Sequence, residues 1–339
     1  MSQTNIDFST KLLSLLSDKE NSVISPYGIA TVLAMAAEGA DRNSLDEILT
    51  CLGFSSLDEL RTAVASVSSN PCDAFRSENA ITFVKGKNTA EMCEQFKKVL
   101  SSQYAAKIHE ESSGEDTAVQ LKNVSSFKAA WSVEMERDIS GRIRFCNSDG
   151  SCCRPAFLKC TEELRYYQDD AFLPTVKAVA LPYALAGCRI PYELVLVDSE
   201  KTINETLLCE ILSNMQRDEC EVEFPEFSIK SNYNLVPMME TLGIKDIFDL
   251  EKSSLSGIAT EPLYAESFSQ DAEIQVDKNG TVAIAITCMM MCLKGGISSP
   301  DKFCFNKPFS YFLRNTRTGE ILFMGKVNKL SDCERRPSE

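Results

Sequence analysis

Residues 279–296 read NGTVAIAITCMMMCLKGG, and this stretch combines features of a strand and of a loop. From Gly280 to Thr287, small and β-branched side chains follow one another, which is typical of an extended strand. The stretch then ends in a glycine-rich polar tail after Lys294, which is typical of a loop. These residues alone leave three readings open: a strand, a loop, or a segment that is each at different times.

The composition limits the classes of function that the chain can have. Its 339 residues are 44% hydrophobic, which is enough to bury a substantial core. A net charge of −14 makes nucleic acids and acidic membrane surfaces unfavourable partners. The only histidine is His109, which excludes multi-histidine metal sites and removes most hydrolase mechanisms that rest on a Ser-His or Cys-His pair. We find no enzyme active site and expect no cofactor.

Fourteen cysteines raise the question of disulfides or bound metal. The N-terminal MSQTNIDFSTKLLSLL lacks the features of a conventional secretory signal, and no apolar run is long enough to span a membrane. We therefore expect a cytoplasmic protein with free thiols, and release by an unconventional route stays open. The spacing of the candidate metal ligands matches no zinc finger, so we expect no metal; they are Cys152, Cys153, Cys288, Cys292 and Cys304.

Hydrophobic periodicity predicts helices early in the chain and strands later. Helices are expected at 5–17, after the Ser25–Pro26 start signal, at 44–49, 57–67 and 203–216, from a Thr89 cap to 104, and from an Asn232 cap to Gly243. Strands are expected at 78–86, 105–111 and 117–131, within 177–198, from 221 onward and in a hairpin over 305–327. We find no repeat or linker, so this pattern predicts one domain with an α+β fold.

Five segments, in this order and approximate spacing, resemble segments of the serpin family. They are NSVISPYGIATVLAMAAEGA (21–40), NVSSFKAAW (123–131), FPEFSIKSNYNLVPMMETLGIKDIFD (224–249), NGTVAIAIT (279–287) and FNKPFSYFLRNTRTGEILFMGKV (305–327). The chain is identified on this resemblance as a single serpin domain over 1–339, of the intracellular ovalbumin-like or the viral or parasite type. The resemblance implies N-terminal helices, a large central mixed sheet, two further sheets and an exposed reactive-centre loop at about 278–303.

The resemblance also answers the question that residues 279–296 raise. A serpin presents its loop as bait; cleavage lets the loop insert as a new strand of the central sheet, and the protease is trapped as an acyl-enzyme. The implied hinge begins at Gly280, and the residues that would turn into the core are Thr281, Ala283, Ala285 and Thr287. All four are small and uncharged, so a strand can enter without overpacking. Lys278 and Asn279 depart from the family, which usually has two glutamates there.

Counting fourteen residues beyond Gly280, as in inhibitory serpins, gives a scissile bond at Lys294–Gly295. The basic side chain suits a trypsin-like serine protease, and the neighbouring bait residues would be Met291, Cys292 and Leu293. Met289, Met290 and Met291 are competing bait positions for chymotrypsin-like or elastase-like enzymes. Two alternative functions stay open: a non-inhibitory binding or storage serpin that is cleaved as a simple substrate, and a cross-class inhibitor of cysteine proteases.

In the family, a polar cluster called the shutter lies under the centre of the sheet. The resemblance assigns Ser25, Asn123 and Gln270 to it, and assigns Trp131 to the top of the sheet, where insertion begins. The family usually has histidine in place of Gln270 and a second serine in place of Gly28. An outward apolar loop face favours strand addition, so we expect a monomer at risk of loop–sheet polymerisation.

Only EESSGED lies between His109, in the strand expected at 105–111, and Thr117, where the next strand begins. Serpins place a long helix across the front of the sheet at this point, so we infer that this helix is missing. A parallel crossover ordinarily needs a dozen or more residues. We therefore expect the strand at 105–111 to be displaced, reversed or lost.

Overall fold

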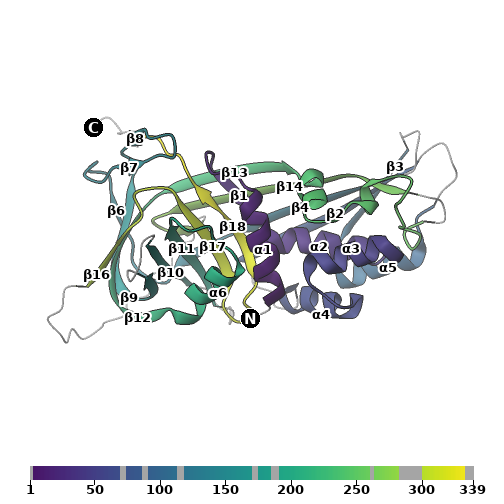
Figure 1. The fold of residues 1–339 in the computed structure, drawn as a ribbon, viewed down its shortest axis with the longest axis horizontal. Helices are drawn as coiled ribbons and strands as arrows, with labels where there is room; N and C mark the ends of the chain where they lie inside the picture. The colour runs from purple at the N-terminus through teal and green to yellow at the C-terminus, as the bar shows by residue number, and fades with distance from the viewer. Residues whose placement is uncertain are drawn as a thin grey trace.

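The computed structural model describes residues 3–68, 74–85, 91–112, 118–169, 175–184, 191–259, 263–281 and 300–332. The helices in these ranges are α1 (Gln3–Leu15), α2 (Pro26–Ala37), α3 (Arg42–Leu52), α4 (Leu57–Ser68), α5 (Glu94–Gln103), α6 (Glu205–Asn214) and α7 (Val236–Thr241). Five of them precede almost all the strands in the chain, and they gather on one side of the long strands (Figure 1). The α+β prediction is confirmed.

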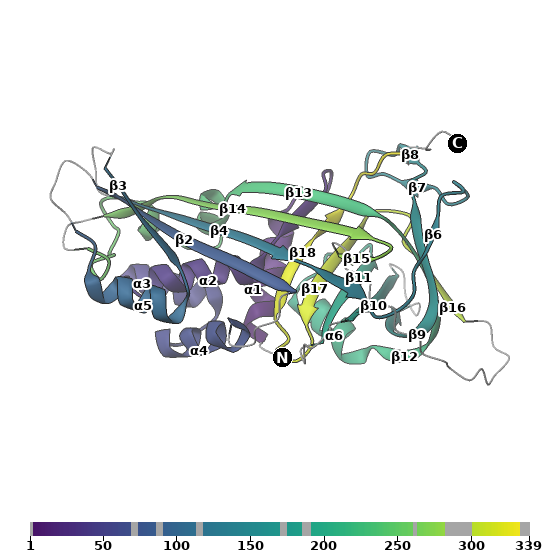
Figure 2. The same ribbon diagram turned by 180° about the vertical axis from the view of Figure 1, so that it is seen from behind.

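The long strands form a mixed central sheet. Its members are β2 (Phe75–Lys85), β3 (Lys107–Ser112), β4 (Ala118–Phe127), β5 (Ala129–Trp131), β13 (Phe227–Asn234), β14 (Tyr264–Asp277) and β15 (Gly280–Thr281). Their spatial order is β3-β2-β4-β14-β13 (Figure 2). Strand β15 pairs with β14 on one side and with β5 on the other. The strand expected at 117–131 is interrupted at Lys128, so β4 pairs with β14 and β5 pairs with β15.

The other strands continue this sheet beyond β5. They are β1 (Ser22–Ile24), β6 (Glu136–Asp138), β9 (Phe157–Asp169), β10 (Val176–Ala184), β11 (Tyr192–Ser199), β12 (Gln216–Pro225), β16 (Asp301–Cys304), β17 (Phe309–Asn315) and β18 (Ile321–Val327). Strand β10 joins β5 to β11, and β9 joins β10 to β12, so that sixteen strands are continuously paired. A separate ribbon consists of β7 (Phe145–Cys146) and β8 (Cys152–Cys153).

Helix α2 lies in the core beneath the central sheet. The Ser25 hydroxyl accepts a hydrogen bond from the Gly28 N–H, and Pro26 opens the helix, as expected for this start signal. Of its 12 residues only Ala30 is not buried, because it packs against β2, β4 and β18 as well as against α1, α3 and α4. The polar residue that caps this helix is therefore held under the middle of the sheet.

Two predicted helix starts are wrong. Strand β13 stays paired with β14 as far as Asn234, so Asn232 is extended, and the side chain that accepts the Val236 N–H is that of Asn234, at 3.2 Å. Helix α5 begins at Glu94, not at Thr89, because the Cys93 N–H donates to the Ile258 carbonyl. In both cases contacts with a distant strand or loop outweigh the local signal.

The prediction that the strand at 105–111 is displaced, reversed or lost is also wrong. Strand β3 pairs in parallel with β2 as the edge strand of the central sheet. Because β2 is antiparallel to β4, strand β3 ends where β4 begins: Ser112 is opposite Lys85, and Ala118 is opposite Val84. That separation is about two strand spacings, roughly 10 Å, which a short connection spans without a parallel crossover.

The outer face of the central sheet carries exposed charged side chains. They include Glu78 on β2, Lys122 on β4 and Glu273 on β14, alongside the exposed apolar Val124. Among the described residues between α5 and α6 there is no helix. The sheet surface in this region is thus suited to contact with water.

Candidate functional site: the hinge and the shutter

The first two residues of the predicted hinge, Gly280 and Thr281, occupy a place in the central sheet. Thr281 pairs with Val276 of β14 on one side and with Ala129 of β5 on the other, both antiparallel. Gly280 pairs in the same way with Asp277 and Ala130. Strand β15 is therefore the start of a strand between β5 and β14.

Only glycine fits at position 280. Its φ of +132° is a conformation that side-chain-bearing residues rarely adopt. A Cβ atom there would lie 2.1 Å from the Ala129 carbonyl oxygen, inside van der Waals contact. The neighbouring strand, and not only the turn, therefore requires this glycine.

Thr281 is held by an aromatic pair. Its side chain is 1% exposed, and its Oγ1 lies 2.7 Å from the Tyr183 hydroxyl. The Trp131 ring stacks on Tyr183 with centroids 4.6 Å apart, and its Nε1–H donates to the Asp277 carbonyl at 2.8 Å. Burial raises the pKa of the Tyr183 phenol well above its usual range. Sequence reasoning did not select Tyr183, because nothing in its own strand shows that its hydroxyl faces a residue 98 positions away.

The fluorescence of the single tryptophan gives a direct test of the position of β15. Replacing Gly280 by valine (Gly280→Val) should expel β15, because the side chain would clash with the Ala129 carbonyl and the backbone would be strained. Tyr183, on which Trp131 stacks, would then lose its contact with Thr281, so the Trp131 emission should shift to longer wavelength and the ring should become accessible to an aqueous quencher. Tryptophan emission spectra of the two proteins measure this.

Gly150→Val is the matched control, since Gly150 also has a positive φ of +82° but has no atom within 4 Å of the added Cβ. It carries similar backbone strain away from the hinge and should leave the emission unchanged. Equal spectra for all three proteins would mean that Gly280 does not hold β15 in place.

Asn123, Gln270 and Ser25, the predicted shutter residues, lie together and are fully buried. Gln270 Nε2 donates to Asn123 Oδ1 at 2.8 Å and to the Ser25 carbonyl at 3.1 Å, while Gln270 Oε1 accepts the Ser25 N–H at 2.7 Å. The Ser25 hydroxyl donates to the Leu322 carbonyl at 2.7 Å. Glutamine thus uses both its donor and its acceptor here.

The network extends to three residues that sequence reasoning missed. Asn123 Nδ2 donates to Asn79 Oδ1 at 2.9 Å and to Ser77 Oγ at 3.0 Å, and the Ser125 hydroxyl donates to Asn123 Oδ1 at 2.9 Å. A signal was present in the alternation of β2, because Asn79 occupies the same face as the buried Ile81. A polar residue at a core position needs buried partners.

Gly28 is required by the same network. A Cβ atom on Gly28 would lie 2.2 Å from Asn123 Oδ1. The amide of Asn123 therefore fills the space that a second serine would need, and the departure from the family pattern at this position has a steric reason.

The shutter spans the seam between β4 and β14. These strands pair in parallel from Ala118 and Tyr264 onward, and Asn123 stands directly opposite Gln270. On the outer face, Lys122 forms an ion pair with Asp271 across the same seam, with 3.0 Å between the charged atoms. The seam is closed below the hinge and held by side-chain contacts on both faces.

The remaining predicted site residues lie outside the described residues. They are Ala283, Ala285, Thr287, Met291, Cys292, Leu293, Lys294 and Gly295. Their flanks are described: Asn279 N–H donates to Asp277 Oδ1 at 2.7 Å in the turn before β15, and β16 begins at Asp301, paired with Cys220 of β12.

Within the described ranges, no three histidine, cysteine, aspartate or glutamate side chains group together in a way that could hold a metal ion. Nor does any helix in those ranges have both the length and the apolar character needed to cross a membrane.

Comparison with known proteins identifies the family. The model of the family described as "Serpin (serine protease inhibitor)" matches residues 3–111 and 107–330. The chain belongs to the serpin family. The two matched parts meet within β3, at the strand that precedes the short connection to β4.

Relatives cover nearly the whole chain. Iripin-2 of Ixodes ricinus is 25% identical, with 97% of this chain and 94% of the relative aligned; human antithrombin-III is 24% identical, with 96% and 81% aligned. The fold resembles that of tengpin, a thermophilic serpin solved in the native state, with a TM-score of 0.80 at 20% identity over 97% of this chain and 94% of tengpin. It equally resembles thyroxine-binding globulin in complex with thyroxine, with a TM-score of 0.80 at 17% identity over 98% and 99% of the two chains.

Membership in the family supports protease inhibition in general. Serpins are protease inhibitors or binding proteins, as the names of these relatives illustrate. The choice between a protease inhibitor and a binding protein therefore rests on the geometry of the hinge and the shutter.

Proposed function

We propose that this serpin inhibits a trypsin-like serine protease and acts once per molecule. The protease serine oxygen attacks the Lys294 carbonyl carbon, the Lys294–Gly295 peptide bond breaks, and the Gly295 nitrogen leaves as an amine after taking a proton. Residues from Val282 onward then insert behind Thr281, between the two strands that flank β15, and the ester between Lys294 and the protease stays unhydrolysed.

The observation that carries this proposal is the pairing of β15. Strand β15 already pairs with both strands between which the loop would enter, so its register can be extended in the antiparallel direction. In this extension Ala283 faces Ile274 and Phe127, and Ala285 faces Ala272 and Ser125. All four facing residues are buried, so the same extension directs the small loop residues into the core.

The extended register brings Thr287 between the two halves of the shutter. Gln270 would lie opposite it on β14 and Asn123 opposite it on β4. Its hydroxyl can both donate and accept, so it can replace the hydrogen bond that joins the two amides across the closed seam. Insertion would then leave no buried amide without a partner, so the shutter adds no hydrogen-bonding penalty to the inserted state.

The length of the loop from Thr281 to Lys294 also matches the length of β14. Strand β14 has 14 residues, from Tyr264 to Asp277. In the extended register Leu293 would face Tyr264, so Lys294 and the attached protease would lie just past the end of β14. The protease would be moved from one end of the sheet to the other.

Incubation with trypsin tests the proposal. We expect a complex that survives denaturing electrophoresis, and a released C-terminal peptide that begins at Gly295 in its mass spectrum. Lys294→Ala should abolish the complex, whereas Lys278→Ala, which removes a lysine from the turn before the hinge, should retain it.

Clean cleavage at Lys294 with trypsin still active would instead identify a non-inhibitory serpin. A complex whose released peptide begins after a methionine between Met289 and Met291 would show that the bait residue is wrong.

A further inference from the structure

Two exposed cysteines face each other on the β7–β8 ribbon, away from the hinge. Cys146 and Cys152 are directly opposite partners in the antiparallel pair, and their sulfur atoms lie 3.3 Å apart without a covalent bond. Both side chains are exposed to solvent. Since β strands alternate faces, the adjacent Cys153 points the other way; it is buried, with its sulfur 4.0 Å from Asn147 Oδ1.

The backbone of this hairpin favours a bond between the two sulfurs. The Asn147 N–H donates to the Ser151 carbonyl at 2.8 Å, whereas the Cys146 N–H points outward to the Asn306 carbonyl at 2.9 Å. Cys146 and Cys152 are therefore a non-hydrogen-bonded pair, in which Cα atoms are about 4.5 Å apart and side chains approach most closely. That separation is within the range of about 4.4–6.8 Å that disulfides span.

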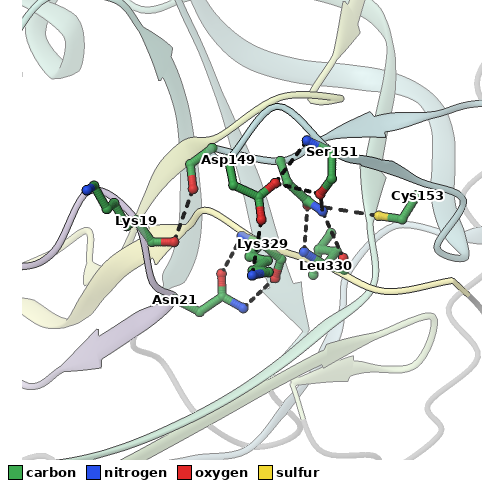
Figure 3. A network of polar contacts seen from close by, with 9 residues as sticks. Lys19, Asn21, Asp149, Ser151, Cys153, Lys329 and Leu330 are labelled. Carbon is green, nitrogen blue, oxygen red and sulfur yellow. Dashed lines mark hydrogen bonds and ion pairs between the residues drawn. The ribbon is translucent and has the colours of Figure 1, made fainter.

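The hairpin, residues 145–153, joins two distant parts of the chain. Asn147 Oδ1 accepts the Leu330 N–H at 2.8 Å, and the Ser148 N–H donates to the Asn328 carbonyl at 2.9 Å. Asp149 forms an ion pair with Lys329 at 3.1 Å (Figure 3). The bond from Cys146 to Asn306 adds the segment that follows β16. Fixing the two strands of the hairpin would fix both segments.

We propose that Cys146 and Cys152 form a thiol–disulfide site that reacts with small disulfides of the glutathione disulfide class. One thiolate attacks a sulfur of the small disulfide, forming a mixed disulfide and releasing one thiolate of the small thiol. The second cysteine, after losing its proton, attacks the protein sulfur of the mixed disulfide and releases the second small thiol. Two protein thiols are oxidised to one disulfide, and the small disulfide is reduced to two thiols.

Solvent exposure and pH govern the reaction of this pair. The hydrogen bond with Cys152 raises the pKa of the Cys146 thiol, so the attacking thiolate forms more readily as the pH rises. A disulfide at an exposed position is among the labile ones, so small thiols can reverse it. Formation of the disulfide would thus restrict the motion of the hairpin and of the segments bonded to it, residues 328–330 and Asn306, and its reduction would restore that motion.

Peptide mapping of the native protein tests the site. The full chain is incubated with glutathione disulfide, its free thiols are alkylated, and it is digested with trypsin; peptide 145–159 then contains Cys146, Cys152 and Cys153. In the protein without substitutions, we expect this peptide to carry one internal disulfide and one alkylated cysteine. The disulfide lowers its mass by about 2 Da relative to the same singly alkylated peptide with two free thiols. The link should persist in Cys153→Ser and be absent in Cys146→Ser and Cys152→Ser, whose remaining partner should carry glutathione.

Cys93→Ser is the matched control, because it removes an exposed cysteine from the start of α5 and should leave the link intact. Three alkylated cysteines in peptide 145–159, with Cys93 glutathionylated in the same sample, would overturn the proposal. So would a link that disappears in Cys153→Ser. A fastening role further requires slower hydrogen exchange at the Ser148 and Leu330 amides after oxidation, and equal exchange would overturn that role.

Discussion

Ala285→Glu is expected to turn an inhibitor into a substrate. In the extended register of β15, residue 285 faces Ala272 and Ser125, which are 2% and 3% exposed. A glutamate at this position would carry its charge into the core, at a cost of at least about 3 kcal/mol. If this cost enters the barrier to insertion, insertion slows about a hundredfold, and hydrolysis of the acyl-enzyme overtakes it. Trypsin should then cleave the loop at Lys294 and remain active.

Ile286→Glu is the matched control for this substitution. The same register directs residue 286 outward, between Val124, which is 40% exposed, and the half-exposed Asp271. A charge there stays in water, so trapping should persist. The number of serpin molecules consumed per trypsin molecule inhibited measures both variants, and neither adds a site for trypsin. If both variants trap equally well, the inserted strand does not follow the register of β15.

Asn123→Ala is expected to cause the largest loss of stability. Asn123 is fully buried and forms four side-chain hydrogen bonds, to Ser77, Asn79, Ser125 and Gln270. Removing its amide leaves a cavity, deprives Asn79 Oδ1 of its donor and leaves Ser125 Oγ only the 3.4 Å contact with Ser77 Oγ. Together these effects should lower the free energy of unfolding by about 3–5 kcal/mol. Urea unfolding of the uncleaved protein measures the change.

Asn232→Ala provides the comparison within the same sheet. Asn232 is exposed on β13, and its side chain donates to Asp271 at 2.5 Å. Its removal should change the free energy of unfolding by no more than about 0.5 kcal/mol. Comparable losses for Asn123→Ala and Asn232→Ala would show that the shutter network contributes little to the closed seam.

Much of the fold could be predicted from local patterns. Ser25 and Pro26 start α2 as predicted, since capping and the fixed φ of proline depend mainly on neighbouring residues. The same reasoning failed at Asn232, which has the chemistry of a helix cap but lies in β13, opposite Asp271. A cap signal contributes about 1 kcal/mol, and continued pairing with a long strand exceeds it.

The sequence by itself determined which positions of this protein are small, polar or flexible: the glycine at 280, the small residues after it and the amides at 123 and 270. The tertiary structure decided which distant residues each of these positions contacts. It brings Tyr183 to Thr281 across 98 residues, and Gln270 to Ser25 across 245. It also aligns β3 beside β2, where a parallel crossover had seemed necessary. The physical reason is that alternation along a strand specifies which side chains point inward, whereas strand order and register depend on distant residues that pack together.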